Sequence, residues 1–455
     1  MSFKKRLLVG VGYTTLGQLI GYAIRLGSTL ILTRLLAPDL FGLIAVGYTF
    51  TYAAALLSDV GLRSSIIQNH RADDIDYRDS VWMIIFIRGI LIGLFVSGAT
   101  VILWLMQKAG LFQLQSVYAD PRILAVLPLL ALAELVKGTE SIEILYRERK
   151  LDFKSLFIFG TVKQVVNTGI TVIWAWLDPG VVALCSGAII GNLVGVILSY
   201  TWLTRRPPKL VWRPDDFLYI LQQGKWLLVS AILTFLMNTV DRIYLAVGLD
   251  AHQLGIYSIA TTLGLIAQEL ATKIGNSVVF PAMSQRIRDG AKDLLSDFYR
   301  IRRPFEWFGM GCGFFLLAFG GDLVHIMYDH RYQAAGKVLR VFGMLCLTLA
   351  YASSTEAYLA MGEAKKNSLV YFTRLTSLIV SLSVLVPLLG VMGGAWSLVC
   401  ASGCGVIAML WCNHRLGLFS LSKELRLLGF MGLGLGFVVL IEYLRHGSLA
   451  GLLLI

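Results

Sequence analysis

The chain has 455 residues, of which 56% are hydrophobic and 15% are charged, and its formal net charge at pH 7 is +12. A soluble domain usually carries about 25% charged residues, so this composition excludes an ordinary soluble protein and predicts a polytopic membrane protein. The six cysteines lie in or beside apolar segments without metal-ligand spacing, which predicts neither a zinc site nor a disulfide framework.

A bilayer-spanning helix needs about 20 mostly apolar residues, and thirteen segments meet this rule. The first begins behind Lys4, Lys5 and Arg6 in the manner of a signal peptide, but it continues to about Leu36 with no small-residue cleavage site, so we expect a spanning helix. The last apolar segment, 447–455, is too short to span alone and is either part of a fourteenth helix or a tail. The predicted fold is an all-α polytopic membrane protein with 12–14 transmembrane helices. The predicted spans are 8–36, 41–60, 80–105, 123–146, 155–177, 181–203, 226–248, 254–278, 304–327, 335–361, 367–390, 393–413 and 427–445.

Lysine and arginine are unevenly distributed between the loops that join these spans. They are frequent in alternate loops, such as 61–79, 204–222 and 284–303, and rare in the intervening loops. Positive residues favour the cytoplasmic side of a membrane, so we expect a multi-pass protein with its N-terminus in the cytoplasm. The basic residues form no clustered footprint, which argues against nucleic acid as a partner.

The middle of the chain holds a candidate linker between two halves. It reads RRPPKLVWRPDD (205–216), with three prolines and mixed charge. After it, LDAHQLGIYSI (249–259) can be laid on LAPDLFGLIAV (36–46), with a glycine at the same position of both. This repeat predicts two pseudo-symmetric helical bundles around a central cavity, where transporters built from parallel repeats hold their substrate. The predicted organisation is an N-terminal lobe of six helices at 1–204, a linker at 205–225, a C-terminal lobe at 226–414 and additional helix at 415–455.

Ten ionisable residues lie inside the predicted spans, where a charge costs about 2.5–3.5 kcal/mol at the bilayer centre. Such residues usually face a water-filled cavity or a partner of opposite charge. Seven of the ten are cationic, so a cavity lined by half of them would be positive and would suit an anion. Arginine is well matched to phosphate, because its planar fork donates two parallel hydrogen bonds. The residues alone predict a carrier of something anionic. The ten are Arg25, Arg88, Glu134, Lys137, Lys163, Asp241, Arg242, Glu269, Lys273 and Arg374.

Arg25 is the most informative of these residues. It lies eleven residues before Leu36, which is roughly 16 Å along a helix, so its side chain cannot reach the membrane surface. We therefore expect Arg25 to face an interior cavity. Asp241 and Arg242 are adjacent and point about 100° apart on a helix, so at least one of them should face the interior of the protein.

Two acidic residues have candidate partners on their own helices. Glu134 lies three residues before Lys137, and Glu269 lies four residues before Lys273. Residues at these spacings share one helical face and can form an ion pair. A structural pair and a functional role are both open for these four residues.

Three intramembrane cations have no such partner, and each has two interpretations. Lys163 and Arg374 lie about two helical turns inside a predicted cytoplasmic boundary, so each can reach the membrane surface or face a cavity. Arg88 has no obvious partner on its own helix, and both interpretations are open for it as well. Glu140 approaches the end of its predicted span, and we expect it to be solvated.

Three segments carry a resemblance to a known family. They are GYTTLGQLIGYAIRLGSTLILTRLLAPDLFGLIAVGYTF (12–50), SDVGLRSSIIQ (58–68) and MNTVDRIYLAVGLDAHQLGIYSIATTL (237–263). With its TRLLAPDLFG turn, the chain resembles the Wzx-type oligosaccharide flippases of the MOP superfamily. The resemblance runs from the first predicted helix to the thirteenth. It implies two lobes around a cationic cavity that opens alternately to either side of the bacterial inner membrane and moves undecaprenyl-diphosphate-linked oligosaccharide to the periplasm.

The resemblance also implies roles for the intramembrane residues. Lipid II flippases of the same superfamily place a cavity-facing arginine in the first helix, and Arg25 corresponds to it in kind, so Arg25 would hold the diphosphate. No catalytic residue, metal or cofactor is implied, and the coupling ion would be a proton or Na⁺. Expected partners are the lipid-linked oligosaccharide, membrane lipids and the polymerase and export machinery of the pathway. The binding candidates are Arg25, Arg242, Lys163, Lys273, Arg88 and Arg374, and the ion-coupling candidates are Glu134, Asp241 and Glu269.

Two other classes of function remain as alternatives. A membrane glycosyltransferase or polymerase would need a catalytic site, but the one D-x-D motif, Asp74-Ile75-Asp76, lies in a short loop beside Asp73 and Asp79 and is interpreted as a solvated acidic loop. The sequence contains neither a large periplasmic loop nor a P-loop. A multidrug cation antiporter of the same superfamily would need an acidic, aromatic cavity, which the positive excess disfavours. The sequence leaves the sugar, the coupling ion and the oligomeric state open.

Overall fold

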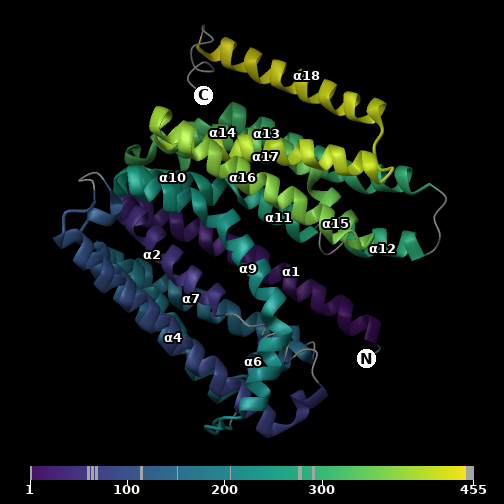
Figure 1. Ribbon diagram of the computed structural model, residues 1–455. Helices are drawn as coiled ribbons and strands as arrows, with labels where there is room; N and C mark the ends of the chain where they lie inside the picture. Colours follow the sequence, from purple (N-terminus) through teal and green to yellow (C-terminus); the bar gives the residue numbers. More distant parts are fainter. Residues whose placement is uncertain are drawn as a thin grey trace. The chain divides into compact units, whose positions relative to one another are not determined.

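The computed structural model describes residues 3–58, 62, 66, 70–112, 116–150, 152–204, 206–274, 279–288 and 293–446. Every regular element in this part of the chain is a helix (Figure 1). Eleven helices of the described residues are long and apolar enough to cross a membrane, so the predicted all-α membrane fold is confirmed. The apolar segment 447–455 lies outside the described residues.

The chain divides into two compact units, unit 1 (Met1–His252) and unit 2 (Gln253–Ile455). This division differs from the predicted lobes, because the helix that follows the predicted linker packs within unit 1. The helices of unit 1 are α1 (Phe3–Leu35), α2 (Pro38–Leu57), η1 (His70–Asp73), α4 (Ile75–Lys108), η2 (Val117–Ala119), α5 (Ile123–Gly138), α6 (Glu143–Arg149), α7 (Phe153–Leu177), α8 (Val181–Leu198), η3 (Ser199–Leu203) and α9 (Pro214–Gly248).

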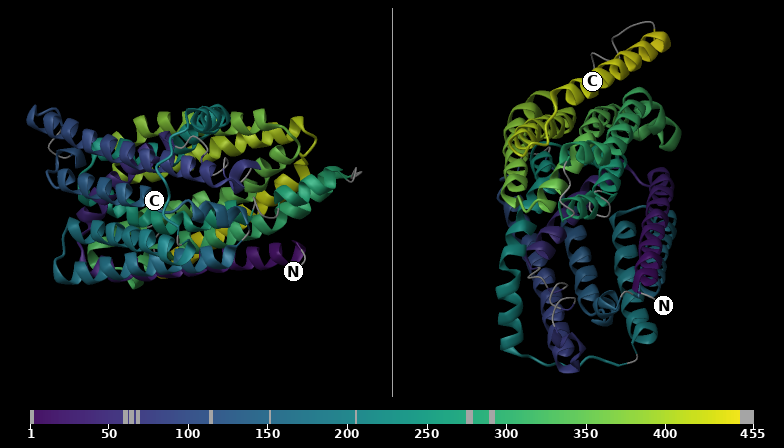
Figure 2. Two further views of the ribbon diagram at one scale, coloured as in Figure 1. Left: turned by 90° about the horizontal axis from the view of Figure 1, so that it is seen from below. Right: turned by 90° about the vertical axis from the view of Figure 1, so that its right-hand side faces the viewer.

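The helices of unit 1 pack as a series. α1 packs along α7, α7 along α8, and α8 along α5, while α5 also contacts α4 and α2, and α2 contacts α9 (Figures 1 and 2). Small residues allow the closest approaches, since a Cβ built on Gly89 of α4 would lie 2.8 Å from Cα of Gly138 on α5. Small residues at helix interfaces are typical of membrane proteins, where close backbone packing replaces the hydrophobic effect.

Three of the predicted loops contain regular helix. α4 begins at Ile75 behind the N-cap Asp74, whose side chain accepts a hydrogen bond from the Asp76 amide. α9 begins at Pro214, a residue favoured in the first turn of a helix. The third is 284–303, in which α13 begins at Leu294. Hydropathy placed these segments outside the spans because they are polar, but capping residues let the helices start before the apolar segments do.

An ionic cap covers the predicted cytoplasmic end of unit 1. A small apolar core, which includes Tyr77, Val81 and Trp82 of α4 and Ile220 of α9, lies beneath it. Around this core, ion pairs join the predicted linker to the predicted acidic loop, with two arginines from the linker and one from the loop. The pairs are Arg206–Asp79 at 2.7 Å, Arg213–Asp76 at 2.7 Å and Arg71–Asp216 at 2.8 Å.

The D-x-D segment is exposed at Asp74 and Asp76, as expected of a solvated acidic loop, but its neighbour Asp79 is not solvated. Asp79 is buried and paired with Arg206, and Asp76, although exposed, is paired with Arg213. The hydroxyl of Tyr146 donates a hydrogen bond to Asp73, and together with the nearby Arg149 it holds the pKa of that carboxyl below its usual range. These carboxylates therefore stabilise the end of the unit.

Unit 2 is built around two long antiparallel helix pairs. α13 packs along α14, α16 packs along α17, and α18 lies on the outside of the unit against α13 (Figures 1 and 2). The predicted span 335–361 is interrupted in the structure by the 3₁₀ segment η6. The helices of unit 2 are α10 (Ala251–Gly264), which starts at the boundary, α11 (Ile266–Ile274), α12 (Phe280–Arg288), α13 (Leu294–Met327), η5 (His330–Tyr332), α14 (Ala334–Leu347), η6 (Thr348–Tyr351), α15 (Ala352–Ala360), α16 (Ala364–Leu389), α17 (Val391–Arg415) and α18 (Leu421–His446).

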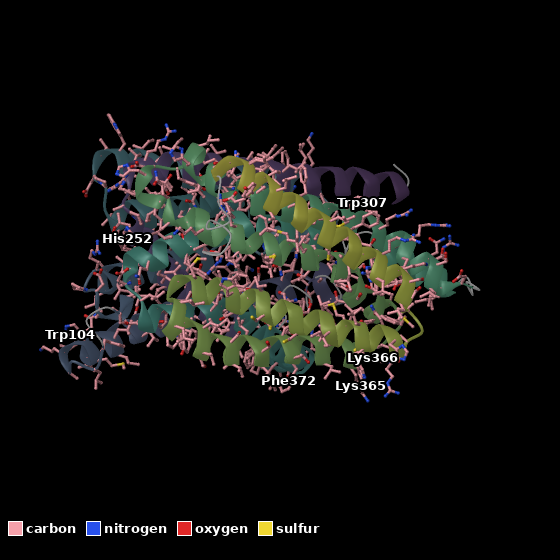
Figure 3. All side chains as sticks on the ribbon, turned by 90° about the horizontal axis from the view of Figure 1, so that it is seen from above. Trp104, His252, Trp307, Lys365, Lys366 and Phe372 are labelled. Atoms are coloured by element: carbon pink, nitrogen blue, oxygen red, sulfur yellow. The ribbon has the colours of Figure 1, made fainter. Side chains whose placement is uncertain are left out.

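The surface of α16 changes character along its length. Lys365 projects from its first turn, and Phe372, two turns farther along, also points outward and is 65% exposed (Figure 3). A change from cations to large apolar side chains is typical of a helix that passes from the membrane interface into hydrocarbon.

Candidate functional site

Arg25 lies in the middle of α1 with its side chain exposed. α1 is held against α7 by small residues, because Gly17 faces Phe157 and the carbonyl of Gly21 accepts a hydrogen bond of 3.0 Å from Gln164. The guanidinium of Arg25 makes no hydrogen bond or ion pair with any described residue. Its charge is therefore available to a ligand.

Arg242 and its neighbour Asp241 occupy α9. Asp241 is buried, in agreement with the expectation that at least one of the two faces the protein interior. Arg242 is half-buried, and its Nε is shielded from solvent without a hydrogen-bond partner. The helix is fixed at its C-terminal end, where the Ser116 hydroxyl donates to the carbonyl of Ala246. Such contacts satisfy carbonyl groups that a helix end leaves unpaired.

Lys163 is paired, and its partner is Glu140. Nζ of Lys163 on α7 contacts Oε1 of Glu140, in the turn between α5 and α6, and both side chains are mostly buried. Gly195 of α8 makes room for the pair, since a Cβ there would lie 2.6 Å from the Glu140 carboxylate. The expectation that Glu140 is solvated is wrong, because its partner comes from a different helix. Lys163 is therefore not a free cation in this structure.

Arg88 of α4 caps the end of α2. Its Nη2 donates to the carbonyl of Ala55 at 2.8 Å, and its Nε donates to the Ser58 hydroxyl at 3.1 Å. A cation at a helix C-terminus is favoured by the partial negative charge of the terminal carbonyls. The structure thus gives Arg88 a partner that sequence spacing could not reveal.

The predicted intrahelical pairs have different outcomes. Nζ of Lys137 lies 3.1 Å from Oε2 of Glu134, so this pair is confirmed. Glu269 is exposed on α11, whereas the side chain of Lys273 lies outside the described residues, so the pairing of these two residues stays a prediction.

Arg374 is a predicted intramembrane cation of unit 2. Its Nη2 donates to the Ser402 hydroxyl at 3.3 Å, and its Nε is buried without a hydrogen-bond partner. The stem of the side chain packs over Gly405 of α17, where a Cβ would lie 2.5 Å from Cγ of Arg374. Among the described residues it has no carboxylate partner. Hydroxyl contacts leave its charge uncompensated, and a buried uncompensated charge is costly.

Sequence reasoning missed a buried carboxylate near this arginine. Glu356 on α15 is 8% exposed, and both Glu356 and Arg374 lie within electrostatic range of Tyr371 on α16. The sequence signal that could have revealed Glu356 was its position inside the predicted span 335–361, five residues before the end of that span.

The structure thus separates the predicted cations into two groups. Lys163, Lys137 and Arg88 have partners within unit 1. Arg25, Arg242 and Arg374 have no carboxylate partner in the part of the chain that the structure describes. In that same part, no group of three or more His, Cys, Asp and Glu residues could hold a metal ion. The available chemistry is the binding of an anion by arginine.

The family is shown by a model described as "Polysaccharide biosynthesis protein", which matches residues 31–337. The chain belongs to this family. The lipopolysaccharide biosynthesis protein WzxC of Escherichia coli is 21% identical over 355 residues, which cover 76% of this chain and 68% of that protein. The succinoglycan biosynthesis transport protein ExoT of Rhizobium meliloti is 23% identical over 290 residues, which cover 63% of this chain and 55% of ExoT.

The fold is similar to that of two solved membrane transporters. The lipid II flippase MurJ, in an inward closed conformation, aligns with this chain with a TM-score of 0.71 and 14% identity. The alignment covers 98% of this chain and 96% of the MurJ chain. An inward-facing multidrug transporter of the MATE family matches 90% of this chain and 98% of its own with a TM-score of 0.62 and 14% identity. Family and fold together confirm the prediction of a polytopic membrane protein of polysaccharide biosynthesis.

Proposed function

We propose that this protein is a flippase that moves undecaprenyl-diphosphate-linked oligosaccharide from the cytoplasmic to the periplasmic leaflet of the bacterial inner membrane. The observation that carries the proposal is Arg25, which lies in the middle of an apolar helix, is exposed, and has no protein partner among the described residues. Membership of the polysaccharide biosynthesis family supports the choice of cargo.

Flipping by alternating access requires no covalent chemistry, so the protein has only to bind the headgroup and release it. In this proposal Arg25 donates a bidentate pair of hydrogen bonds to the diphosphate. Arg242, which lies in the same unit, supplies a further cationic contact, whereas Arg374 and Lys273 of unit 2 stay predicted binding residues. Lys163 and Arg88 become structural residues, because their charges already have partners.

The proposal includes coupling to a proton or Na⁺ gradient. Asp241, Glu134 and Glu269 remain the candidates for the coupling site. Asp241 is buried in α9 beside Arg242, so a change in its charge would act directly on a proposed headgroup contact. Glu134 is paired with Lys137 on its own helix.

A vesicle assay tests the role of Arg25. Purified protein is reconstituted with a fluorescent prenyl-diphosphate oligosaccharide, and the transfer of the probe between leaflets is timed. We expect Arg25→Ala to slow flipping at least tenfold, because a lost charge-assisted hydrogen bond costs about 1.5–3 kcal/mol. Arg25→Lys should retain an intermediate rate, since a lysine keeps the charge but lacks the fork.

Arg213→Ala is the matched control, because this arginine is also solvent-accessible but belongs to the ionic cap. It should flip at the wild-type rate. Undiminished flipping by Arg25→Ala would remove the proposed role of that residue. Export of cationic dyes by the same vesicles, without transfer of the lipid-linked probe, would instead favour the multidrug antiporter.

A further inference from the structure

The broken helix of unit 2 contains a candidate hinge. α14 and α15 together form one membrane span, Ala334–Ala360, and the 3₁₀ segment η6 (Thr348–Tyr351) interrupts it near the middle. A stretch of 3₁₀ helix inside a longer helix often marks a hinge, because its hydrogen bonds are poorer than those of the α-helix. η6 therefore allows the angle between α14 and α15 to change.

A buried cluster of four residues, which we call the Arg302 clamp, holds this hinge. It consists of Tyr299, Arg302, Tyr351 and Glu424. Arg302 is 0% exposed, and its Nη1 and Nη2 donate to the two carboxylate oxygens of Glu424 at 2.6 and 3.0 Å. The hydroxyls of Tyr299 and Tyr351 donate to the same carboxylate at 2.7 and 2.8 Å. Four donors on one buried carboxylate make this the most completely satisfied charge described in unit 2.

Tyr351 connects the clamp to the hinge, since it is the last residue of η6. Its hydroxyl binds Glu424, and its ring lies 4.2 Å from the guanidinium carbon of Arg302. On α13, Gly309 lets the helix backbone approach η6, because a Cβ there would lie 3.2 Å from Cβ of Leu349. The hinge is thus packed against α13 and also bound through Tyr351 to a residue of α18.

α18 has a second anchor that does not reach the hinge. Glu442 is buried near the end of α18 and pairs with Arg340 of α14 at 2.8 Å. It lies eighteen residues after Glu424, roughly 27 Å along the helix. Arg340 precedes η6 by eight residues. Both anchors fasten α18 to unit 2, and Glu424 is the one whose carboxylate binds Tyr351 of η6.

We propose that Glu424 is a positioning residue that fixes the angle between α14 and α15 by binding Tyr351. α18 then does more than pack on the outside of unit 2, because its first turn sets the state of a hinge in another span. This inference goes beyond the proposed function, and it can be tested on the purified protein without any cargo.

Hydrogen–deuterium exchange of the full chain in lipid nanodiscs tests the proposal. We expect Glu424→Gln and Tyr351→Phe to accelerate amide exchange in residues 348–360 by about tenfold, because local opening becomes easier when the hydroxyl–carboxylate contact is weakened or lost. Tyr351→Phe keeps the ring over Arg302 and removes only the hydroxyl, so it remains informative if Glu424→Gln folds poorly.

Glu442→Gln is the matched control on the same helix. It should accelerate exchange in the last turns of α18 and leave residues 348–360 at the wild-type rate, even though it lowers thermal stability as Glu424→Gln does. Equal acceleration of 348–360 by Glu424→Gln and Glu442→Gln would overturn the proposal, because the hinge would then depend only on the docking of α18. Wild-type exchange in Tyr351→Phe would also overturn it.

Discussion

Arg25 and Arg302 are the same residue type in opposite environments. Arg25 is exposed on α1 and has no partner among the described residues, whereas Arg302 is fully buried on α13 and binds Glu424 through two hydrogen bonds. An arginine with its partners built into the fold stabilises the protein, while an arginine without them is free for a ligand. The pairing of an intramembrane charge is therefore a better guide to its role than its depth.

The largest expected effect is on stability, and it separates the two arginines. Arg302→Gln should lower the free energy of unfolding by about 3–5 kcal/mol, because it leaves the Glu424 carboxylate buried without its cation. Arg25→Gln should change the same quantity by less than about 0.5 kcal/mol, as surface substitutions usually do. Unfolding in mixed micelles of increasing SDS content measures both values. Equal losses would contradict the distinction between a structural and a free arginine.

Loss of the pair formed by Lys163 and Glu140 should have an effect of intermediate size on stability. It tests the same distinction between a paired and a free cation. Lys163→Met should destabilise the protein by about 1–3 kcal/mol, because Glu140 loses its partner in a mostly buried site. The double variant Lys163→Met, Glu140→Gln should recover at least half of this loss. Both are measured in the same micelle titration. If Lys163→Met instead abolished flipping with no loss of stability, Lys163 would belong with Arg25 among the ligand-binding cations.

The smallest expected effect is on the pH dependence of stability, and it involves the carboxylate of Asp152, which lies outside the membrane spans. Partial burial of Asp152 is outweighed by hydrogen bonds from Ser155 and Arg147, which hold the pKa of this carboxyl below the ordinary 3.8. Its contribution to stability is therefore complete above the pKa of the unfolded chain and is lost as the pH falls through the lower folded value. Thermal unfolding between pH 7 and pH 3, a range that crosses the ordinary aspartate pKa of about 3.9, should show a smaller acid-induced loss for Asp152→Asn than for wild type. Identical pH dependence in the two proteins would refute this assignment.

The sequence predicted the membrane fold well, because hydrocarbon thickness sets the length of an apolar helix and backbone groups must be paired within it. It also predicted the Glu134–Lys137 pair, since both residues lie on one helical face. These features depend on local spacing. Local spacing can be read directly from one chain.

The contacts between helices could not be predicted in the same way. The partners of Lys163 and Arg88 lie 23 and 30 or more residues away, on other segments. Arg302 was placed in the predicted loop 284–303, but α13 begins at Leu294 and carries it into the interior. Glu424 is 122 residues from it in sequence. Only tertiary packing decides which of two chemically identical arginines keeps a free charge.

The ionic cap makes one end of unit 1 sensitive to the salt concentration of the surrounding water. α9 has 35 residues, about 52 Å of helix, which exceeds the roughly 30 Å of hydrocarbon in a bilayer. Its start therefore lies outside the hydrocarbon, where the pair formed by Arg213 and Asp76 is exposed to ions and water. Mobile ions screen exposed charges over about 8 Å at physiological ionic strength but act little on buried pairs. Raising the salt concentration should loosen this end of the unit and leave the charges within the bilayer unaffected, so ionic strength can probe one end of the protein without disturbing its transport path.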